Sequence, residues 1–328
     1  MLNRRQLRIK VLQALYAFIF SENDNLIKGE KELLSSIEKT KELFVWQISV
    51  AIELADLMSQ KLDDRKRKFL PTEKDLNPNY RFVNNRILTQ WKENRDVVKL
   101  IKYYKVSWIE NIEAFRRLAN NFESSEVYAK YLERKDSYAN DKDILICLYN
   151  DFVYEDDFFI DFYETKNMYW YTDFCMMNFL MAKFIDDYKE SYDEFTPLQE
   201  IFKAISGVSD EKEDKDFVIS LFSKVIIHRE EYTQIVNKFT KNWDPDRISA
   251  MDVLIIIMAI TEIVHFPHIP VRVTLNEYID ISKIFSTPKS KTFINGVLDS
   301  AYNYLLEEGK IKKTGRGLVN RSSDNSDK

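Results

Sequence analysis

The chain has 328 residues, of which 45% are hydrophobic and 31% are charged, and its formal net charge is −5. This length is sufficient for about two domains of roughly 150 residues each, and the composition excludes a largely disordered chain. Only 6 glycines and 7 prolines are present, and the glycines form no phosphate-binding motif. Because sheet proteins and nucleotide-binding loops need many such turn residues, the composition predicts an all-α fold and argues against a Rossmann-type or P-loop enzyme.

The first predicted element is an amphipathic helix that begins after Asn3, a residue type suited to an N-cap. Leu7, Val11 and Leu15 recur at helical spacing and define its buried face.

Four cations precede the first carboxylate of the chain: they are Arg4, Arg5, Arg8 and Lys10. Cations in a first helical turn oppose the helix dipole, so helix stability does not explain them. On a helical wheel Arg4 and Arg8 lie within about 60° of the apolar face, where they would be buried without partners. We therefore expect the first turn to extend beyond the core, or to become ordered on binding a polyanion.

The middle of the chain is acidic, since residues 22–215 hold 39 carboxylates and 29 cations. Helices are predicted there near residues 30–60, 93–132, 142–150, 169–189 and 195–206. Residues 151–164 alternate six carboxylates with aromatic side chains. We expect the rings to pack into a core and the carboxylates to face solvent; the alternative is an acidic surface that binds a basic partner or covers a basic binding face.

The last third of the chain contains clear signals for the starts and ends of helices. Helices are predicted near residues 214–228 and 229–241, and Ser249 should cap the next helix. That helix contains DVLIIIMAITEIVHF, which is apolar almost all round and should lie at the centre of a bundle. A further helix is expected over 276–285, and a final one should begin at Thr287, with Pro288 in its first position.

Several segments together resemble the NusB family of bacterial transcription antitermination factors. They are the arginine-rich opening that runs into QALY at 13–16, LNEYIDISKIF at 275–285 and FINGVLD at 293–299. The resemblance covers residues 1–22 and 214–308 and implies an all-α, NusB-like pair of helical bundles without catalytic activity. Residues 23–213 would then be a mostly helical, acidic insertion, and residues 309–328 a flexible basic and polar tail.

The resemblance also implies the partners. NusB proteins bind the boxA element of ribosomal RNA leader transcripts together with NusE, a ribosomal protein of the small subunit, and the pair helps RNA polymerase to resist termination. We therefore expect a boxA-like single strand, NusE and the antitermination complex as partners, no cofactor or metal, and no membrane. Two cysteines and the lack of a long apolar run favour the cytoplasm.

Single-stranded RNA is held by cations that neutralise phosphates and by planar groups that stack on bases. The expected RNA-binding residues are Arg4, Arg5, Arg8, Lys10, Gln13, Tyr16, Lys289, Lys291 and Phe293. The resemblance places Asp252 at the NusE contact, although a carboxylate in the first turn of a helix is favourable by itself.

Other functions are weighed against this hypothesis. A Ser-x-x-Lys match at 286–289 is explained by a helix cap, and the Glu-x-x-His at 262–265 lacks the second copy that a di-iron bundle needs. The alternatives that remain are a helical adaptor or scaffold whose insertion binds a protein partner, and an RNA-modifying accessory subunit, because part of some RNA cytosine methyltransferases also resembles NusB.

Overall fold

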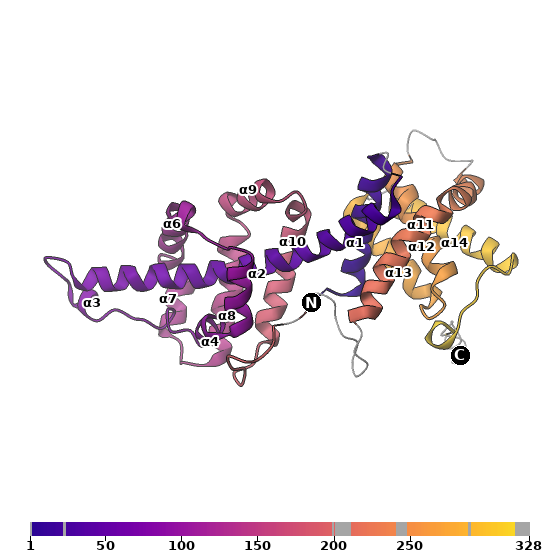
Figure 1. Cartoon of the computed structure of the whole chain (residues 1–328). Coiled ribbons are helices and arrows are strands. Elements are labelled where there is room, and N and C mark those ends of the chain that lie inside the picture. The colour runs from indigo at the N-terminus through magenta and orange to yellow at the C-terminus, as the bar shows by residue number, and fades with distance from the viewer. Residues whose placement is uncertain are drawn as a thin grey trace. The chain divides into compact units, whose positions relative to one another are not determined.

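The structure is a computed structural model, and it describes residues 2–21, 24–198, 200, 211–240, 248–287 and 290–318. Over these residues the secondary structure is helical and no strand is present, which confirms the expected all-α fold (Figure 1). Among the same residues no helix is long and apolar enough to cross a lipid bilayer.

The chain packs into two compact units. One comprises residues 1–36 and 202–328, and the other comprises residues 37–201. The long helix α2, Leu26–Lys66, contributes to both. The domain boundaries expected from the resemblance, at 22/23 and 213/214, stay a prediction.

The unit formed by the two ends of the chain is built around one apolar helix. Its helices are α1 (Arg4–Phe20), α11 (Glu211–Thr240), α12 (Ala250–His265), α13 (Val271–Phe285) and α14 (Ser290–Glu307), together with the start of α2. Helix α12 contacts α1, α11, α13 and α14, and its residues from Leu254 to Ile263 are buried. The expectation of a central helix is therefore confirmed, and the Ser249 hydroxyl caps it by accepting from the Asp252 N–H.

The unit of residues 37–201 contains the rest of α2 and a series of shorter helices. These are α3 (Glu73–Leu76), α4 (Arg86–Glu93), α5 (Arg95–Tyr103), α6 (Ile112–Glu123), α7 (Glu126–Glu133), α8 (Tyr138–Cys147), α9 (Asp157–Lys166) and α10 (Trp170–Asp187). A short 3-10 segment, Ile109–Asn111, directly precedes α6. A π segment, Leu148–Val153, directly follows α8. Its core is aromatic: the Trp46 ring contacts those of Trp108, Phe162 and Trp170.

The acidic and aromatic segment 151–164 takes the role expected of an amphipathic element. Phe159 and Tyr163 are buried in the aromatic core, whereas Asp157, Asp161 and Glu164 are exposed. Dispersion and hydrophobic burial of the rings therefore account for this segment.

Two predicted helix boundaries were wrong. The helix expected over 93–132 is broken into α5, α6 and α7, because Lys105 adopts a left-handed conformation with φ 53° and Ser125 caps α7. The two helices expected over 214–241 are a single helix, α11, since no breaking residue stands between them.

The helix expected over 195–206 falls mostly outside the described residues, and residues 192–198 are not helical. Pro288 and Lys289, expected at the start of the last helix, also lie outside the described part of the chain.

Candidate functional site

The start of α1 lies beside an open groove in the unit formed by residues 1–36 and 202–328. The groove has a volume of about 980 Å³ and is lined from α1, the start of α11, the turn at residues 266–270, α13 and the segment after α14. Arg4, Arg5 and Arg8 all line it, and Arg316 joins them. We call this site the arginine groove.

Arg8 forms the floor of the arginine groove and is held by a buried carboxylate. Its Nε and Nη2 donate to the two oxygens of Glu262 at 2.7 and 2.8 Å. Glu262 also accepts from the hydroxyls of Thr274 and Tyr278. Burial alone would lower the pKa of the Arg8 guanidinium, but the charge and hydrogen bonds of Glu262 outweigh it and raise this pKa above its ordinary value.

This arrangement corrects the expectation for the first turn of α1. The turn is ordered and packed on the core, and the Asn3 side chain caps it in a capping box with Gln6. The helical wheel was right that Arg8 points inward. Its partner could not be seen locally, because Glu262 lies 254 residues away in α12.

Arg4 and Arg5 form the rim of the groove, each with carboxylate partners. The Arg5 guanidinium is bidentate to Glu277, at 2.9 Å for both bonds, and its Nη2 lies 2.7 Å from Asp280. Its side chain nevertheless stays 41% exposed. Its partners Glu277 and Asp280 are partly exposed, so solvent screens these pairs and lowers the cost of exchanging one anion for another.

Arg4 combines an ion pair with an aromatic contact. Its Nε lies 2.6 Å from the Asp214 carboxylate, and its guanidinium lies 4.4 Å from the centre of the Phe217 ring. The Phe217 ring in turn packs edge-on against Phe266, with 5.3 Å between ring centres. Cationic and aromatic groups therefore alternate along this wall, as they do in sites for single-stranded nucleic acid.

Lys10 and Phe293, which were expected to contact RNA, are buried. The Lys10 ammonium donates to the Ser36 carbonyl at 3.4 Å, inside the core and away from the groove lining. Phe293 is 5% exposed in the first turn of α14. The apolar stem of Lys10 and the Phe293 ring thus serve packing in this structure.

Other expected RNA-binding residues are accessible but lie outside the lining of the arginine groove. Tyr16 is 39% exposed and packs beside Phe20, and Gln13 is half-buried one turn before it. Lys291 is exposed at the start of α14. The structure does not bring these three side chains into the groove.

Asp252, the expected NusE contact, is buried at 1% exposure. Its carboxylate accepts a hydrogen bond from the Ser286 hydroxyl, at the end of α13. This bond ties the start of α12 to the end of α13, so the buried carboxylate has a structural role.

The segment after α14, residues 310–318, is docked against the turn that follows α12, although a flexible tail was expected from residue 309. We call it the C-terminal strap. The Thr314 N–H donates to the Pro267 carbonyl at 3.0 Å, and the Lys313 ammonium donates to the Phe266 carbonyl at 3.0 Å. A Cβ added to Gly317 would lie 1.9 Å from the Pro267 oxygen, so only glycine fits there.

The strap supplies Arg316, the groove residue that sequence reasoning missed. Arg4, Arg5 and Arg8 are all paired with carboxylates, whereas Arg316 is exposed and forms no ion pair with any residue that the structure describes. The signal in the sequence was the Gly-Arg-Gly at 315–317, which fits close backbone contact better than a loose tail.

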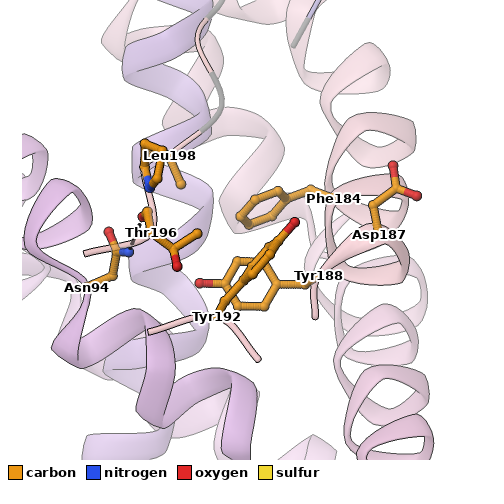
Figure 2. A pocket seen from close by; sticks show the side chains of 8 residues that line it. Asn94, Phe184, Asp187, Tyr188, Tyr192, Thr196 and Leu198 are labelled. Carbon is orange, nitrogen blue, oxygen red and sulfur yellow. Dashed lines mark hydrogen bonds between the residues drawn. The ribbon is translucent and has the colours of Figure 1, made fainter. Parts of the chain in front are cut away.

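A smaller cavity of about 180 Å³ lies within the unit of residues 37–201. Figure 2 shows Phe184, Tyr188 and Tyr192 on one side of it and Asn94 and Leu198 on the other. The Asn94 amide donates to the Thr196 carbonyl and accepts from the N–H groups of α5. Because these polar groups are satisfied within the protein, we assign no ligand to this cavity.

Comparison with known proteins finds a family match in the C-terminal part of the chain. Residues 179–303 match the model of the NusB family. The chain is 41% identical over 105 residues to a protein of Salinibacter ruber named transcription antitermination protein NusB, a match that covers 32% of this chain and 66% of that protein. Proteins of the same name from Chloroherpeton thalassium and Natranaerobius thermophilus are 36% and 37% identical.

These matches are partial on both sides. They cover 32% and 27% of this chain in the second and third cases, and 50% and 64% of the relatives' own lengths. The chain thus spans between half and just under two thirds of the relatives that it matches. No solved structure matches the chain. All four groove arginines lie outside the family match, three of them in α1 and Arg316 in the C-terminal strap.

Proposed function

The chain carries a NusB family domain at residues 179–303, and on this premise we propose that it is a non-enzymatic transcription antitermination factor that binds single-stranded RNA in the arginine groove. The observation that carries the proposal is the convergence of Arg4, Arg5 and Arg316 from two distant parts of the chain on one open groove. Guanidinium groups recognise phosphates bidentately, and the Phe217 and Phe266 wall supports them.

The specific RNA, protein partner and compartment that we propose are those of the NusB family. We propose a boxA-like element of a ribosomal RNA leader as the RNA, NusE as the protein partner, the RNA polymerase antitermination complex as the assembly and the cytoplasm as the compartment. Lys291, Gln13 and Tyr16 are accessible and could extend the RNA contact outside the groove. Arg8, Lys10, Phe293 and Asp252 are left out of the proposed contacts because their side chains are buried.

Within the groove the arginines have different roles. Arg8 is a positioning residue, since Glu262 holds its guanidinium bidentately and so fixes the base of α1. Arg5 would exchange its carboxylates for phosphates, and Arg4 would exchange its contact with the exposed Glu213 while keeping its pair with the buried Asp214. Arg316 would bind phosphate without such an exchange. RNA affinity should therefore depend more on Arg316 than on either rim arginine alone.

The test is a fluorescence anisotropy titration of a labelled boxA-like RNA with the full chain, in a series of salt concentrations. Replacing Arg4, Arg5 and Arg316 by alanine should lower the affinity and flatten the salt dependence, by about 0.7 in the log–log slope for each lost phosphate contact. A charge-matched control replaces three exposed cations of the other unit, Lys99, Lys102 and Arg116. Equal affinity of the triple variant and the control would remove the arginine groove from the RNA site.

The partner is tested separately. Titration of NusE into the chain with and without the boxA-like RNA should give tighter binding in the presence of RNA, because we propose that the chain binds the two together and binding energies on one protein are reciprocally coupled. Binding of NusE that is identical with and without RNA would contradict this part of the proposal.

A further inference from the structure

The end of α2 and the loop after it, residues 61–81, concentrate positive charge within the acidic middle of the chain. We call this segment the α2 tip. It holds seven cations, Lys61, Arg65, Lys66, Arg67, Lys68, Lys74 and Arg81, against four carboxylates, Asp63, Asp64, Glu73 and Asp75. Because residues 22–215 as a whole are strongly acidic, this local excess of cations is not explained by composition.

Two large apolar side chains of the α2 tip are exposed to solvent. Phe69 is 98% exposed and Leu70 is 81% exposed, directly after the run of four cations from Arg65 to Lys68. A single exposed apolar residue needs no explanation. An aromatic ring held open beside several cations, however, offers a stacking surface next to charges that attract a polyanion.

A groove of about 670 Å³ lies beside the α2 tip, between α2, the loop at residues 77–79, and helices α6 and α7. We call it the tip groove. Its lining includes the cations Lys61, Arg65 and Lys74 and the side-chain amides of Asn77, Asn79 and Asn120. The Asn79 oxygen accepts from the Arg81 N–H and the Asn120 oxygen accepts from the Lys61 ammonium, so these two amides present chiefly their NH₂ donors to the groove. Amide donors and acceptors are groups that pair with the edges of nucleobases.

The ion pairs leave part of this charge available. Lys61 and Arg65 share one carboxylate, Glu123, at 2.6 and 2.8 Å. Arg67 and Lys74 are exposed and form no ion pair with the residues that the structure describes. These two cations can therefore bind an anion without giving up a partner.

We propose that the α2 tip and the tip groove form a second site for single-stranded RNA, separate from the arginine groove. Arg67 and Lys74 bind phosphates, Phe69 stacks on an unpaired base, and the asparagine amides of the tip groove contact base edges. Anionic lipid also attracts cations beside apolar residues. It presents no base edges for the three asparagine side chains to contact, so RNA is the ligand that fits the whole surface. The inference does not depend on RNA binding in the arginine groove.

The test uses the full chain and a short fluorescein-labelled oligouridylate at low salt. Replacing Arg67 and Lys74 by alanine should lower the affinity roughly 3- to 10-fold and flatten the log–log salt slope by about 1.4, for two contacts to a single strand. Phe69→Ala should lower the affinity about fivefold or more, because one stacked base is lost. With its ring exposed to solvent, Phe69 can be replaced without disturbing the core.

Matched controls lie in the same unit. Lys99→Ala with Lys102→Ala removes two exposed cations of α5, and Ile109→Ala removes an apolar side chain that is 82% exposed. Both controls should bind the oligouridylate within about twofold of the unaltered chain, since each removes the same charge or a similar surface elsewhere. Ultraviolet crosslinking of thiouridine-substituted RNA should also label a peptide that contains Phe69.

The outcomes separate this inference from the proposed function. Loss of affinity in the tip variants, with the controls unchanged, supports the second site whatever the arginine groove variants do. Unchanged affinity in the tip variants overturns it, and the arginine groove is then judged by its own variants. If the tip variants bind RNA normally but no longer sediment with vesicles of phosphatidylglycerol and phosphatidylcholine, the surface is a lipid contact and the RNA site is overturned.

Discussion

Arg8 and Glu262 form a bidentate ion pair, with N–O distances of 2.7 and 2.8 Å, inside the unit that joins the two ends of the chain. Thr274 and Tyr278 donate to the same carboxylate. The pair connects α1 to α12 and α13, and it places the remaining arginines of α1 at the edge of the arginine groove. The buried pair is therefore the structural basis of the exposed site.

Breaking the Arg8–Glu262 pair should lower the stability of the fold. Arg8→Ala leaves the Glu262 carboxylate buried without a cation, and we expect the free energy of unfolding to fall by about 3–5 kcal/mol. Urea denaturation followed by circular dichroism measures this change. Arg116→Ala, which breaks an exposed pair in α6, serves as the control and should cost less than about 1 kcal/mol. A loss below that value for Arg8→Ala would contradict the structural role of the pair.

Removing one of the two carboxylates that neutralise Arg5 should strengthen RNA binding. Glu277→Gln keeps a hydrogen-bond acceptor for Arg5 but removes one of its two carboxylate partners and leaves Asp280, so a phosphate meets less competing negative charge. We expect the affinity for a boxA-like RNA to rise several-fold at low salt, measured by fluorescence anisotropy.

Glu126→Gln provides the control for overall charge. It changes the net charge by the same amount, in an exposed pair with Lys130. An equal rise in both variants would mean that net charge, and not the release of Arg5, is responsible.

The docking of the C-terminal strap should depend on Gly317. Gly317→Ala places a Cβ within 1.9 Å of the Pro267 oxygen, so the strap must move away and carry Arg316 with it. Limited proteolysis should then cut within residues 310–318 much faster, and RNA affinity should fall toward that of Arg316→Ala.

The matched glycine is Gly296, in α14. A Cβ there meets no atom within 4 Å, and alanine should stabilise the helix by about 0.5–1 kcal/mol without affecting the strap. Protease resistance of Gly317→Ala equal to that of Gly296→Ala would show that the strap does not need close contact with Pro267.

Acid should destabilise the unit through His265. Burial, together with the nearby charge of His228 and Lys224, lowers the pKa of His265 from 6.5 to about 4. The unfolded chain therefore binds a proton between pH 6.5 and pH 4 that the folded chain does not, and the free energy of unfolding falls as the pH is lowered through that window.

His265→Gln tests this. Glutamine can still pair with the Tyr232 hydroxyl, which lies 2.8 Å from the His265 Nε2, but it does not titrate. Urea denaturation at a series of pH values should give a shallower fall in stability between pH 6.5 and pH 4 for the variant. Parallel curves for the two proteins would assign the acid sensitivity to other groups.

The sequence by itself determined the fold class and much of the helical framework. Scarce glycine and proline predicted helices, and local signals placed several helix starts correctly, because caps such as Asn3 and Ser249 act within one turn of the chain. The apolar run in α12 likewise identified the centre of the bundle, since burial all round requires an apolar surface all round. The arginines at the start of the chain were recognised as a feature that helix stability does not explain.

Only the tertiary structure decided what each of those side chains does. Arg4, Arg5 and Arg8 look alike in the sequence. A carboxylate of α12 holds Arg8 inside the core, whereas carboxylates of α11 and α13 hold Arg4 and Arg5 at the rim of the groove. Lys10 and Asp252 are buried against Ser36 and Ser286, and Arg316 lines the groove because Gly317 lets the strap lie on Pro267. Charge and helical period are local properties of a chain, whereas burial and ion pairing depend on residues that are distant in the sequence.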